Sequence, residues 1–372
     1  MEALVFLWRF SPFCVRRRCG KKRASRRKRF LFLLLKRLLF SRILQFMKYS
    51  IKEISELAHV APSTVSKALN GQRGVSEEKR AEIIKIAGEH NYIPNASARA
   101  LSHKSAEAIG LIIPAGKNRS LLGSYWSEII AAIAEEVSSR GYSLLLFVLD
   151  SEKRLEGLKE MVLRQNVDGL IIPAEEITLD AYNLLIDLKI PFVLQGRSKV
   201  CNHYSVDVQN MSGAAALTRS LLRQGCKKCA CVAGPEEYLY SRERVEGFRT
   251  VMADSGIGNA PVLYSLYSEQ KALLDIRNFF EKNRDVDGVF ITAGGEFAFY
   301  VLRVLKELGF DMSSFGVSVF DDFEPLHFLP FPVTSAKQPV RLMGTQTAKN
   351  LFQLLSGEEP PSLSLFDITL VQ

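Results

Sequence analysis

The chain has 372 residues, of which 47% are hydrophobic, so it is long enough to bury more than one core, and we expect two to three domains. Its formal charge of +9 is unevenly distributed. Residues 1–46 hold fourteen Lys and Arg and one acid, whereas the remainder holds 35 basic and 39 acidic residues. Six cysteines in a chain of this length, without an export signal, exclude a small disulfide-rich secreted fold.

The basic leader, residues 1–46, is open to several interpretations. A secretory signal is disfavoured because the apolar run Phe30–Phe40 is interrupted by Lys36 and Arg37, and no small-residue cleavage site follows it. A transmembrane helix is disfavoured because no stretch approaches about eighteen uninterrupted apolar residues. Two interpretations remain: a tail that binds anionic lipid or nucleic acid, or upstream sequence translated from a misassigned start, with the true start at Met47.

Three short helices are predicted within residues 49–92. Ser50 with Glu53 three residues later is a capping box, which predicts a helix beginning at the next residue. Pro62 suits the first position of a second helix, because its missing N–H costs nothing there, and Ser76 caps a third. The second helix turns a row of small polar and basic side chains outward. This arrangement is typical of a helix-turn-helix, although three helices packed for stability alone would show the same periodicity.

Alternating strand and helix signals occupy residues 108–372. The strand signals are Ala108–Ile113, Ser143–Leu149, Gly169–Ile172, Phe192–Leu194, Cys229–Ala233, Gly288–Thr292 and Val317–Phe320. The helical signals are Glu128–Ser139, Arg154–Gln165, Gly213–Arg223, Glu243–Asp254, Lys271–Asn283 and Glu296–Leu308. Apolar strands alternating with amphipathic helices predict parallel sheets covered on both faces. We expect two such units in tandem, with a ligand between them at the carboxyl ends of the strands.

The sequence resembles the LacI/GalR family of bacterial transcription repressors. The resemblance is carried in order by IKEISELA, PSTVSKALNG, VSEEKR and NYIPNASARAL, which leads into AIGLIIP, and it continues to the C-terminus. It implies an N-terminal all-α helix-turn-helix headpiece followed by an α/β effector domain of two doubly wound parallel-sheet lobes, like a periplasmic binding protein. Because the similarity begins beside Met47, we favour the misassigned start.

The resemblance also implies domain boundaries. Residues 1–46 are the leader, 47–94 the helix-turn-helix DNA-binding domain, 95–107 the hinge helix and linker, and 108–372 the two-lobed effector-binding and dimerisation domain. The chain is implied to cross between the lobes near Val206–Gln209, Pro332–Lys337 and Ser356–Pro361.

A DNA interface is implied on the second helix and on the hinge. The residues concerned are Pro62, Ser63, Thr64, Ser66, Lys67, Asn70, Arg99 and Leu101. Of these, Pro62, Ser63 and Lys67 occupy base-reading positions, while the hinge leucine, Leu101, is implied to wedge into the minor groove. Lys67 stands where the family usually has Arg, so the paired hydrogen bonds that a guanidinium can donate to one base are lost. His59 replaces a turn glycine, where a left-handed backbone is mildly strained.

A small-molecule effector site is implied between the lobes. Its residues are Trp126, Arg244, Tyr267, Glu296 and Asp321. Arg244 lies in Ser241–Phe248, which matches the family pattern S-x-x-R-x-x-G-F; the alternative is a solvated helix residue. Gly295 stands where the family has an Asp that holds sugar hydroxyls, and Glu296 is one residue away. This departure weighs against an ordinary hexose and leaves an anionic ligand, an atypical ligand or none.

These observations predict a cytoplasmic, homodimeric, sequence-specific repressor that binds a pseudo-palindromic double-stranded DNA operator and responds to a sugar-related small molecule, without membrane partners. A dimer is expected because no heptad helix precedes Gln372. The alternatives are an effector-independent regulator with a decayed cleft and, less favoured, a solute-binding protein. An enzyme is not expected, because no Ser/His/Asp arrangement, metal cluster or P-loop is recognisable. No cofactor or metal is expected either, since the run Cys226, Cys229 and Cys231 lacks a second pair or a nearby His at ligand spacing, and Cys229–Val232 reads as the start of a buried strand.

Overall fold

The computed structural model describes residues 49–69, 71–90, 92, 105–113, 124–149, 154–164, 167–293 and 295–372. The chain divides into two compact units, Met1–Asn95 and Ala96–Gln372. Within the described ranges, none of the helices combines the length and the apolar character that a membrane span requires. The leader and the hinge residues Arg99 and Leu101 lie outside the described residues, as does Asn70.

The described part of the first unit is a small three-helix fold of α3 (Ile51–Leu57), α4 (Pro62–Leu69) and α5 (Glu77–Glu89). The predicted capping box is present: the Ser50 Oγ accepts from the Glu53 N–H, and the Ser50 N–H donates to Glu53 Oε2 at 2.6 Å. Five fully buried apolar residues form the core, namely Ile54, Ala58, Val65, Ala68 and Ile83. The predicted left-handed turn is also found, with His59 at φ 51°.

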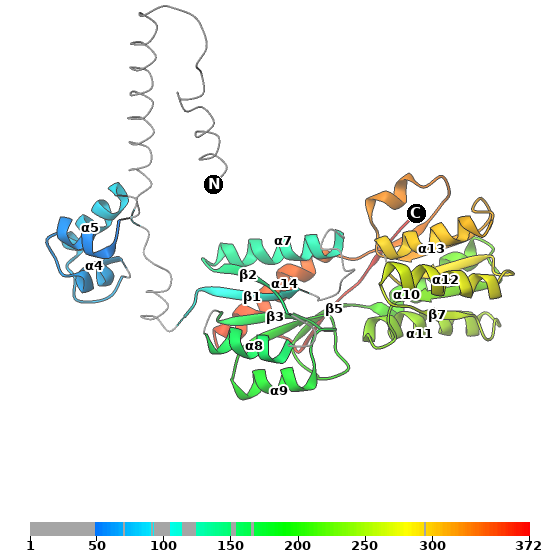
Figure 1. Cartoon of the computed structure of the whole chain (residues 1–372), viewed down its shortest axis with the longest axis horizontal. Coiled ribbons are helices and arrows are strands. Elements are labelled where there is room, and N and C mark those ends of the chain that lie inside the picture. The colour runs from blue at the N-terminus through cyan, green and yellow to red at the C-terminus, as the bar shows by residue number, and fades with distance from the viewer. Residues whose placement is uncertain are drawn as a thin grey trace, which may run out of the picture. The chain divides into compact units, whose positions relative to one another are not determined.

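The second unit contains two lobes, each a six-stranded sheet with helices on both faces (Figure 1). Lobe 1 has the strand order β11-β5-β4-β3-β1-β2. Its strands are β1 (Ala108–Ile113), β2 (Ser143–Val148), β3 (Gly169–Pro173), β4 (Phe192–Gln195), β5 (Ser205–Val208) and β11 (Leu363–Phe366), and all its pairings are parallel. Its helices are α7 (Ser124–Ser139), α8 (Arg154–Leu163), α9 (Leu179–Asp187) and α14 (Val340–Leu355).

Lobe 2 repeats the plan with the strand order β12-β10-β9-β8-β6-β7. Its strands are β6 (Cys229–Ala233), β7 (Val262–Tyr264), β8 (Gly288–Ile291), β9 (Gly316–Phe320), β10 (Thr334–Lys337) and β12 (Thr369–Val371). Its helices are α10 (Asn210–Arg223), α11 (Leu239–Asp254), α12 (Glu269–Lys282), α13 (Glu296–Glu307) and the 3-10 turn η2 (Glu324–Phe328). The last strand, β12, pairs antiparallel with β10 at the sheet edge, which makes lobe 2 a mixed sheet.

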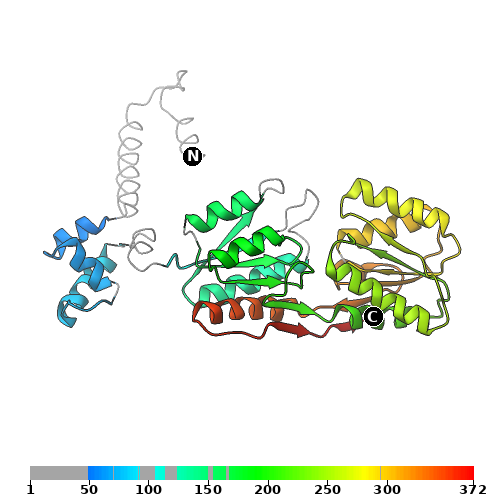
Figure 2. The ribbon, with the colours of Figure 1, turned by 90° about the horizontal axis from the view of Figure 1, so that it is seen from below.

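The chain crosses between the lobes after β5, after β10 and between β11 and β12. The first crossing is where the sequence placed it, and the second lies just beyond Lys337. The third prediction, Ser356–Pro361, is wrong, because that segment leads from α14 into β11, which still pairs with β5 in lobe 1. The chain leaves lobe 1 only after Phe366, and its red C-terminal segment reaches lobe 2 in Figure 2.

The seven predicted strands and six predicted helices of residues 108–372 are all present, with small differences at their ends. Strands β5, β7, β10, β11 and β12 and helices α9 and α14 were not predicted. The missed strands have only three or four residues, and all but β7 mix polar with apolar side chains, so they lack the long continuous apolar run of a central parallel strand.

Candidate functional sites: an exposed helix and an interlobe cleft

Helix α4 presents the expected residues to solvent. Pro62, Ser63 and Lys67 are exposed, while Val65 and Ala68 are buried against the other helices. Ser63 and Lys67 are four residues apart, so they share one outward face. Thr64 and Ser66 are half-buried beside them.

Arg80 of α5 fixes the C-terminal end of α4, a contact that the sequence did not reveal. Its guanidinium donates to the carbonyl oxygens of Ala68 at 2.8 Å and Gln72 at 2.7 Å, and to that of Lys67 at 3.3 Å. The last carbonyls of a helix have no partner within it, and a cation there also complements the helix dipole. Arg80 therefore holds the exposed helix in place.

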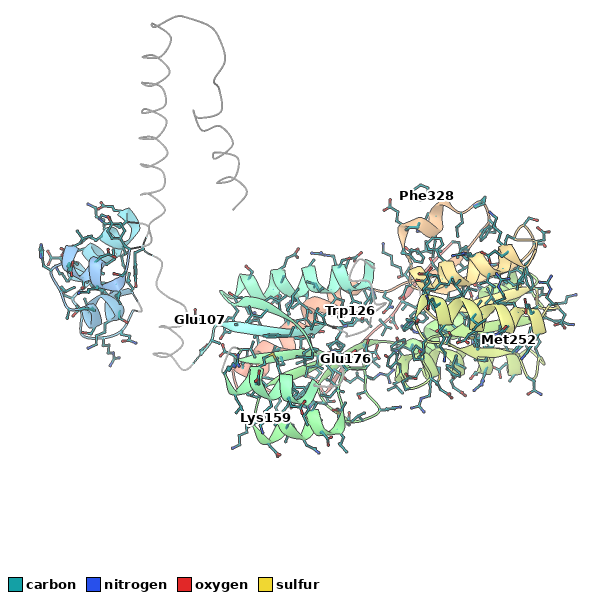
Figure 3. The ribbon with its side chains drawn as sticks, viewed as in Figure 1. Glu107, Trp126, Lys159, Glu176, Met252 and Phe328 are labelled. Carbon is teal, nitrogen blue, oxygen red and sulfur yellow. The ribbon has the colours of Figure 1, made fainter. Side chains whose placement is uncertain are left out.

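A cavity of about 350 Å³ lies between the lobes of the second unit. It is lined from lobe 1 by Tyr125, Trp126, Ala174, Glu175, Ile177, Gln195, Gly196, Arg197, Ser198, Lys199, Val200 and Asp207, and from lobe 2 by Glu237, Tyr238, Leu239, Tyr240, Arg244, Tyr267, Ala293, Gly295, Phe297, Tyr300, Asp321 and Gln338. Most of these residues lie at or just beyond the carboxyl ends of strands, where open parallel sheets bind ligands. Figure 3 shows Trp126 and Glu176 at the end of lobe 1 that faces lobe 2.

Arg244 is a buried cavity residue, so the alternative of a solvated helix residue is wrong. Its side chain is held by Asn210 Oδ1 at 2.8 Å from Nε and by the Thr292 carbonyl at 2.6 Å from Nη1. The guanidinium also lies 3.5 Å from the centroid of the Phe320 ring. Among the described residues, none accepts a hydrogen bond from Nη2, and Arg244 is part of the cavity lining.

Arg197 joins the two lobes, a role that the sequence analysis missed. Its Nε donates to Asp207 Oδ2 at 3.1 Å within lobe 1, and its Nη2 donates to Glu243 Oε2 at 2.5 Å on α11 of lobe 2. Burial raises the pKa of both carboxyls, and Arg197 opposes that rise only in part. The position of Arg197 just beyond a predicted strand was the available signal, but its partner Glu243 is distant in sequence.

The aromatic residues predicted for the cavity are present on both sides of it. In lobe 1, Tyr125 and Trp126 pack edge-to-face with centroids 5.6 Å apart. In lobe 2, the Tyr267 hydroxyl lies 3.0 Å from that of Tyr240, and its ring packs against Phe297 at 5.2 Å. Tyr240 and Phe297 were not predicted, because neither belongs to a recognised motif.

Of the two remaining predicted residues, Asp321 is described at the cavity and the side chain of Glu296 is not described. Asp321 lines the cavity, adopts φ 112° and accepts a hydrogen bond from Gln338. The Gly295 backbone also lines the cavity, whereas the side chain of Glu296 lies outside the described residues. Position 295 itself carries no carboxylate. Among the described residues of lobe 2, the carboxylates that line the cavity are those of Glu237 and Asp321.

The fold brings Asp287 to Cys226 and Cys229, which the sequence spacing did not show. One ligand-type atom from each lies within 4.8 Å of the others. The Asp287 carboxylate, however, accepts the backbone N–H groups of Lys227 at 2.7 Å and Lys228 at 2.8 Å. A carboxylate that closes a turn typically accepts backbone N–H groups in this way. These hydrogen bonds explain why Asp287 lies beside the two cysteines without a bound ion.

Comparison with known proteins places these sites in a family. Residues 106–370 match the family of periplasmic binding proteins and sugar binding domain of LacI family, and residues 50–95 match the bacterial regulatory proteins, lacI family. The chain belongs to the LacI family. Proteins of this family are DNA-binding regulators rather than enzymes. The chain is accordingly a DNA-binding transcription regulator.

Individual LacI-family relatives match over nearly their whole length. The regulator CelR of Thermobifida fusca is 26% identical over 85% of this chain and 95% of its own length. The ribose operon repressor of Halalkalibacterium halodurans is 28% identical over 82% of this chain and 89% of its own length. A solved structure of a CelR–cellobiose complex is 25% identical, with a TM-score of 0.66 over 87% of this chain and 99% of its own. The fold is also that of the lac repressor dimer bound to operator, at 24% identity and TM-score 0.74, over 87% of this chain and 98% of the repressor.

Proposed function

We propose that the chain is a cytoplasmic repressor in which residues 47–94 bind the operator, residues 95–107 form the hinge, and residues 108–372 bind the effector and dimerise, after a basic leader at 1–46. The exposed row on α4 supports the first assignment. In this proposal Pro62, Ser63 and Lys67 occupy the base-reading positions. Thr64, Ser66 and Asn70 serve phosphate contact and capping. Arg99 and Leu101 belong to the same interface through the hinge.

The effector binds in the interlobe cavity in this proposal. Arg244 Nη2 donates to a ligand oxygen, Trp126 and Tyr267 provide ring faces, and Asp321 with Glu296 supplies acceptors. The observation that carries the proposal is the buried arginine network, in which Arg244 is fixed by Asn210 and by the Thr292 carbonyl. Preorganised polar groups that converge on a sizeable cavity favour a working site over a decayed one. Because CelR has been captured with cellobiose, we propose a sugar-related ligand.

Dimerisation is proposed through the face that carries the β2 edge of lobe 1. Among the strands that the structure describes, β2 is the last of its sheet, and Leu145, Leu146 and Val148 are 36%, 50% and 69% exposed. Leu155 and Leu163 of α8 are also exposed. An apolar edge strand left in water is an association hazard that proteins cover, and a second copy covers it symmetrically.

Operator selection from random duplexes with the purified chain tests the DNA-binding part. We expect a pseudo-palindromic site, with half-sites related by the two-fold axis of the dimer. Replacing Lys67 with Ala should reduce affinity for that site by about 1–3 kcal/mol if it reads a base. If Lys67 contacts a phosphate instead, the loss should be uniform across sequences and the salt slope should fall by about one. The exposed Lys85 of α5 offers a matched control, Lys85→Ala.

A further inference from the structure

Two cysteines lie close together where lobe 2 passes from α10 into β6. Cys226 follows the helix and Cys229 opens the strand, with only two residues between them. Their sulfur atoms lie within 4.8 Å of each other. Cys226 is 8% exposed and Cys229 is 1% exposed, so an oxidant from solvent meets Cys226 first. The pair lies at the amino ends of the lobe 2 strands, opposite the carboxyl ends that line the interlobe cavity, so it is separate from the proposed effector site.

Hydrogen bonds to Asp287 hold the turn between the two cysteines. The two residues of the turn, Lys227 and Lys228, donate their backbone N–H groups to the Asp287 carboxylate. The Cys226 thiol donates to the Asp287 carbonyl oxygen at 3.6 Å. Because the turn and the first thiol are tied to the same residue, the fold itself keeps the two sulfur atoms together.

Two glycines leave the space that the Cys226 sulfur occupies. A Cβ at position 316 would lie 2.3 Å from this sulfur, and a Cβ at position 288 would lie 3.0 Å from it. Gly288 begins β8 and Gly316 begins β9, so the sulfur lies directly against the backbone at the amino ends of these two strands. Any larger residue at position 316 would push Cys226 away from its partner.

The two thiols differ in acidity. A hydrogen bond from the Cys229 side chain lowers the pKa of Cys226, and a backbone hydrogen bond from Gly316 acts in the same direction, whereas burial and the Asp287 carboxylate oppose the change. The same bond, together with burial, raises the pKa of Cys229. Cys-X-X-Cys pairs form and break disulfides through this inequality, because the more acidic thiol attacks and the second thiol resolves the product.

We propose that Cys226 and Cys229 form a reversible redox site, in which hydrogen peroxide converts the two thiols into a disulfide that ties the C-terminal end of α10 to β6. The Cys226 thiolate attacks one peroxide oxygen. An S–O bond forms, the O–O bond breaks, and the departing hydroxide takes up the thiol proton and leaves as water. The Cys229 sulfur then attacks the Cys226 sulfur. An S–S bond forms, the S–O bond breaks, and the hydroxyl group leaves as water with the proton of Cys229.

The electrons balance in this sequence, because the two sulfurs together lose two electrons and the peroxide gains them. A dithiol reductant reverses the oxidation by thiol–disulfide exchange. In the cytoplasm proposed above, the pair is kept reduced until an oxidant appears, and a disulfide formed there is transient.

Peptide mapping of the full-length protein tests the inference, because trypsin sites lie between the two cysteines. The native protein is exposed to hydrogen peroxide, its remaining thiols are blocked with N-ethylmaleimide during denaturation, and the product is digested. Cleavage after Arg223, Lys227, Lys228 and Arg242 puts Cys226 in peptide 224–227 and Cys229 in peptide 229–242. We expect these two peptides to be joined after oxidation and to separate with dithiothreitol. If both peptides carry the maleimide label instead, or if Cys226 is joined to a cysteine outside peptide 229–242, the inference is wrong.

Cys231 provides the matched control, because it lies in the same tryptic peptide as Cys229. It is fully buried, and burial raises the pKa of its thiol, so we expect it to stay reduced. Cys231→Ser should therefore keep the joined peptides, whereas Cys229→Ser should lose them. In Cys229→Ser the sulfenic acid of Cys226 has no resolving thiol, so dimedone should label it.

Fragment ions that divide the peptide at Ala230 locate the bridge in the wild type as well, so the test does not depend on the folding of a variant. A bridge to Cys231, or joined peptides that persist in Cys229→Ser, would overturn the inference. The readout is a mass and requires neither operator nor effector, so its failure would leave the proposed function untouched.

Discussion

At the scale of single residues, Gly247 shows how the motif S-x-x-R-x-x-G-F serves packing as well as binding. Helices α10 and α11 approach so closely that a Cβ at position 247 would lie 2.3 Å from the Met211 carbonyl oxygen and 3.0 Å from the Ala214 Cβ. Three residues before it, Arg244 enters the cavity. The same stretch of α11 therefore sets both the helix spacing and the position of the binding group.

Gly247→Ala should lower the free energy of unfolding of the second unit by about 1–3 kcal/mol, because backbone atoms that cannot rotate away must move. Gly88 in α5 provides the contrast, since a Cβ there meets nothing within 4 Å. Gly88→Ala should stabilise the headpiece by about 0.5–1 kcal/mol, because alanine loses less conformational entropy in a helix. Denaturant unfolding of both variants measures the two changes, and equal effects of the two substitutions would contradict this assignment.

Glu243 should give the protein a pH-dependent stability of unusual sign. Burial raises the pKa of its carboxyl above the ordinary 4.5. At pH values between 4.5 and the raised pKa, the folded state therefore holds a proton that the unfolded chain has released. This contribution to the free energy of unfolding is therefore largest below 4.5 and decreases as pH rises through the raised pKa. Glu243→Gln should reduce the decrease, of which the part that comes from the raised pKa of Asp207 remains, while Glu246→Gln, at an exposed position on the same helix, serves as the control. Coincident profiles for the wild type and Glu243→Gln would contradict the expectation.

Motif residues were predictable at this scale, and their partners were not. Trp126, Arg244, Tyr267 and Asp321 converge on the cavity as expected, although their roles in binding remain proposals. Arg197 was missed because its significance lies in an ion pair with Glu243 on the other lobe. A single sequence carries no signal for such a long-range pairing.

At the scale of elements, Arg80 makes the exposed face of α4 depend on α5. Arg80→Met removes two hydrogen bonds to carbonyls at the end of α4 and a third to the Gln72 carbonyl beyond it. The substitution should cost about 1–3 kcal/mol of headpiece stability, with a loss of operator affinity. Lys85→Met changes a side chain that is 76% exposed on the same helix and should leave headpiece stability within about 0.5 kcal/mol. Thermal unfolding of the headpiece, followed by circular dichroism, distinguishes the two; an unaffected Arg80→Met would show that α4 needs no such support.

The β2 edge should determine the oligomeric state. Val148→Lys places a charge on the exposed apolar strand and should shift the dimer towards monomer in sedimentation equilibrium. The same substitution at Phe328, which is exposed on η2 of lobe 2, should leave the dimer intact. A stable dimer in Val148→Lys would place the interface elsewhere.

Element prediction followed the strength of the periodic signal. The continuous apolar strand β1 was located to the residue, whereas β5 and β10, with Ser205 and Ser335 inside them, were not recognised. In β5, Asp207 lines the cleft and pairs with Arg197, whereas in β10 Ser335 donates to Asp322, which is not among the lining residues. For β5, the requirements of the site thus weakened the pattern that sequence reasoning uses.

At the scale of the whole molecule, the two-lobed plan was predictable because each lobe repeats the alternation of strands and helices. The late third crossing was not, because β11 is a short strand with half-exposed side chains at a sheet edge. Three crossings connect the lobes, and the bridge from Arg197 to Glu243 adds an ionic link between them. A ligand that prefers one lobe arrangement would shift that equilibrium by its difference in affinity for the two states.

The most direct test of this account is the affinity of the dimer for its selected operator, measured by fluorescence anisotropy with and without a saturating concentration of a ligand that binds the interlobe cavity. The account predicts a change of about 5- to 150-fold, which corresponds to a coupling free energy of about 1–3 kcal/mol, and the loss of that change in Arg244→Ala. An operator affinity that the bound ligand leaves unchanged, or a dimer without preference for any duplex over bulk DNA, would contradict it.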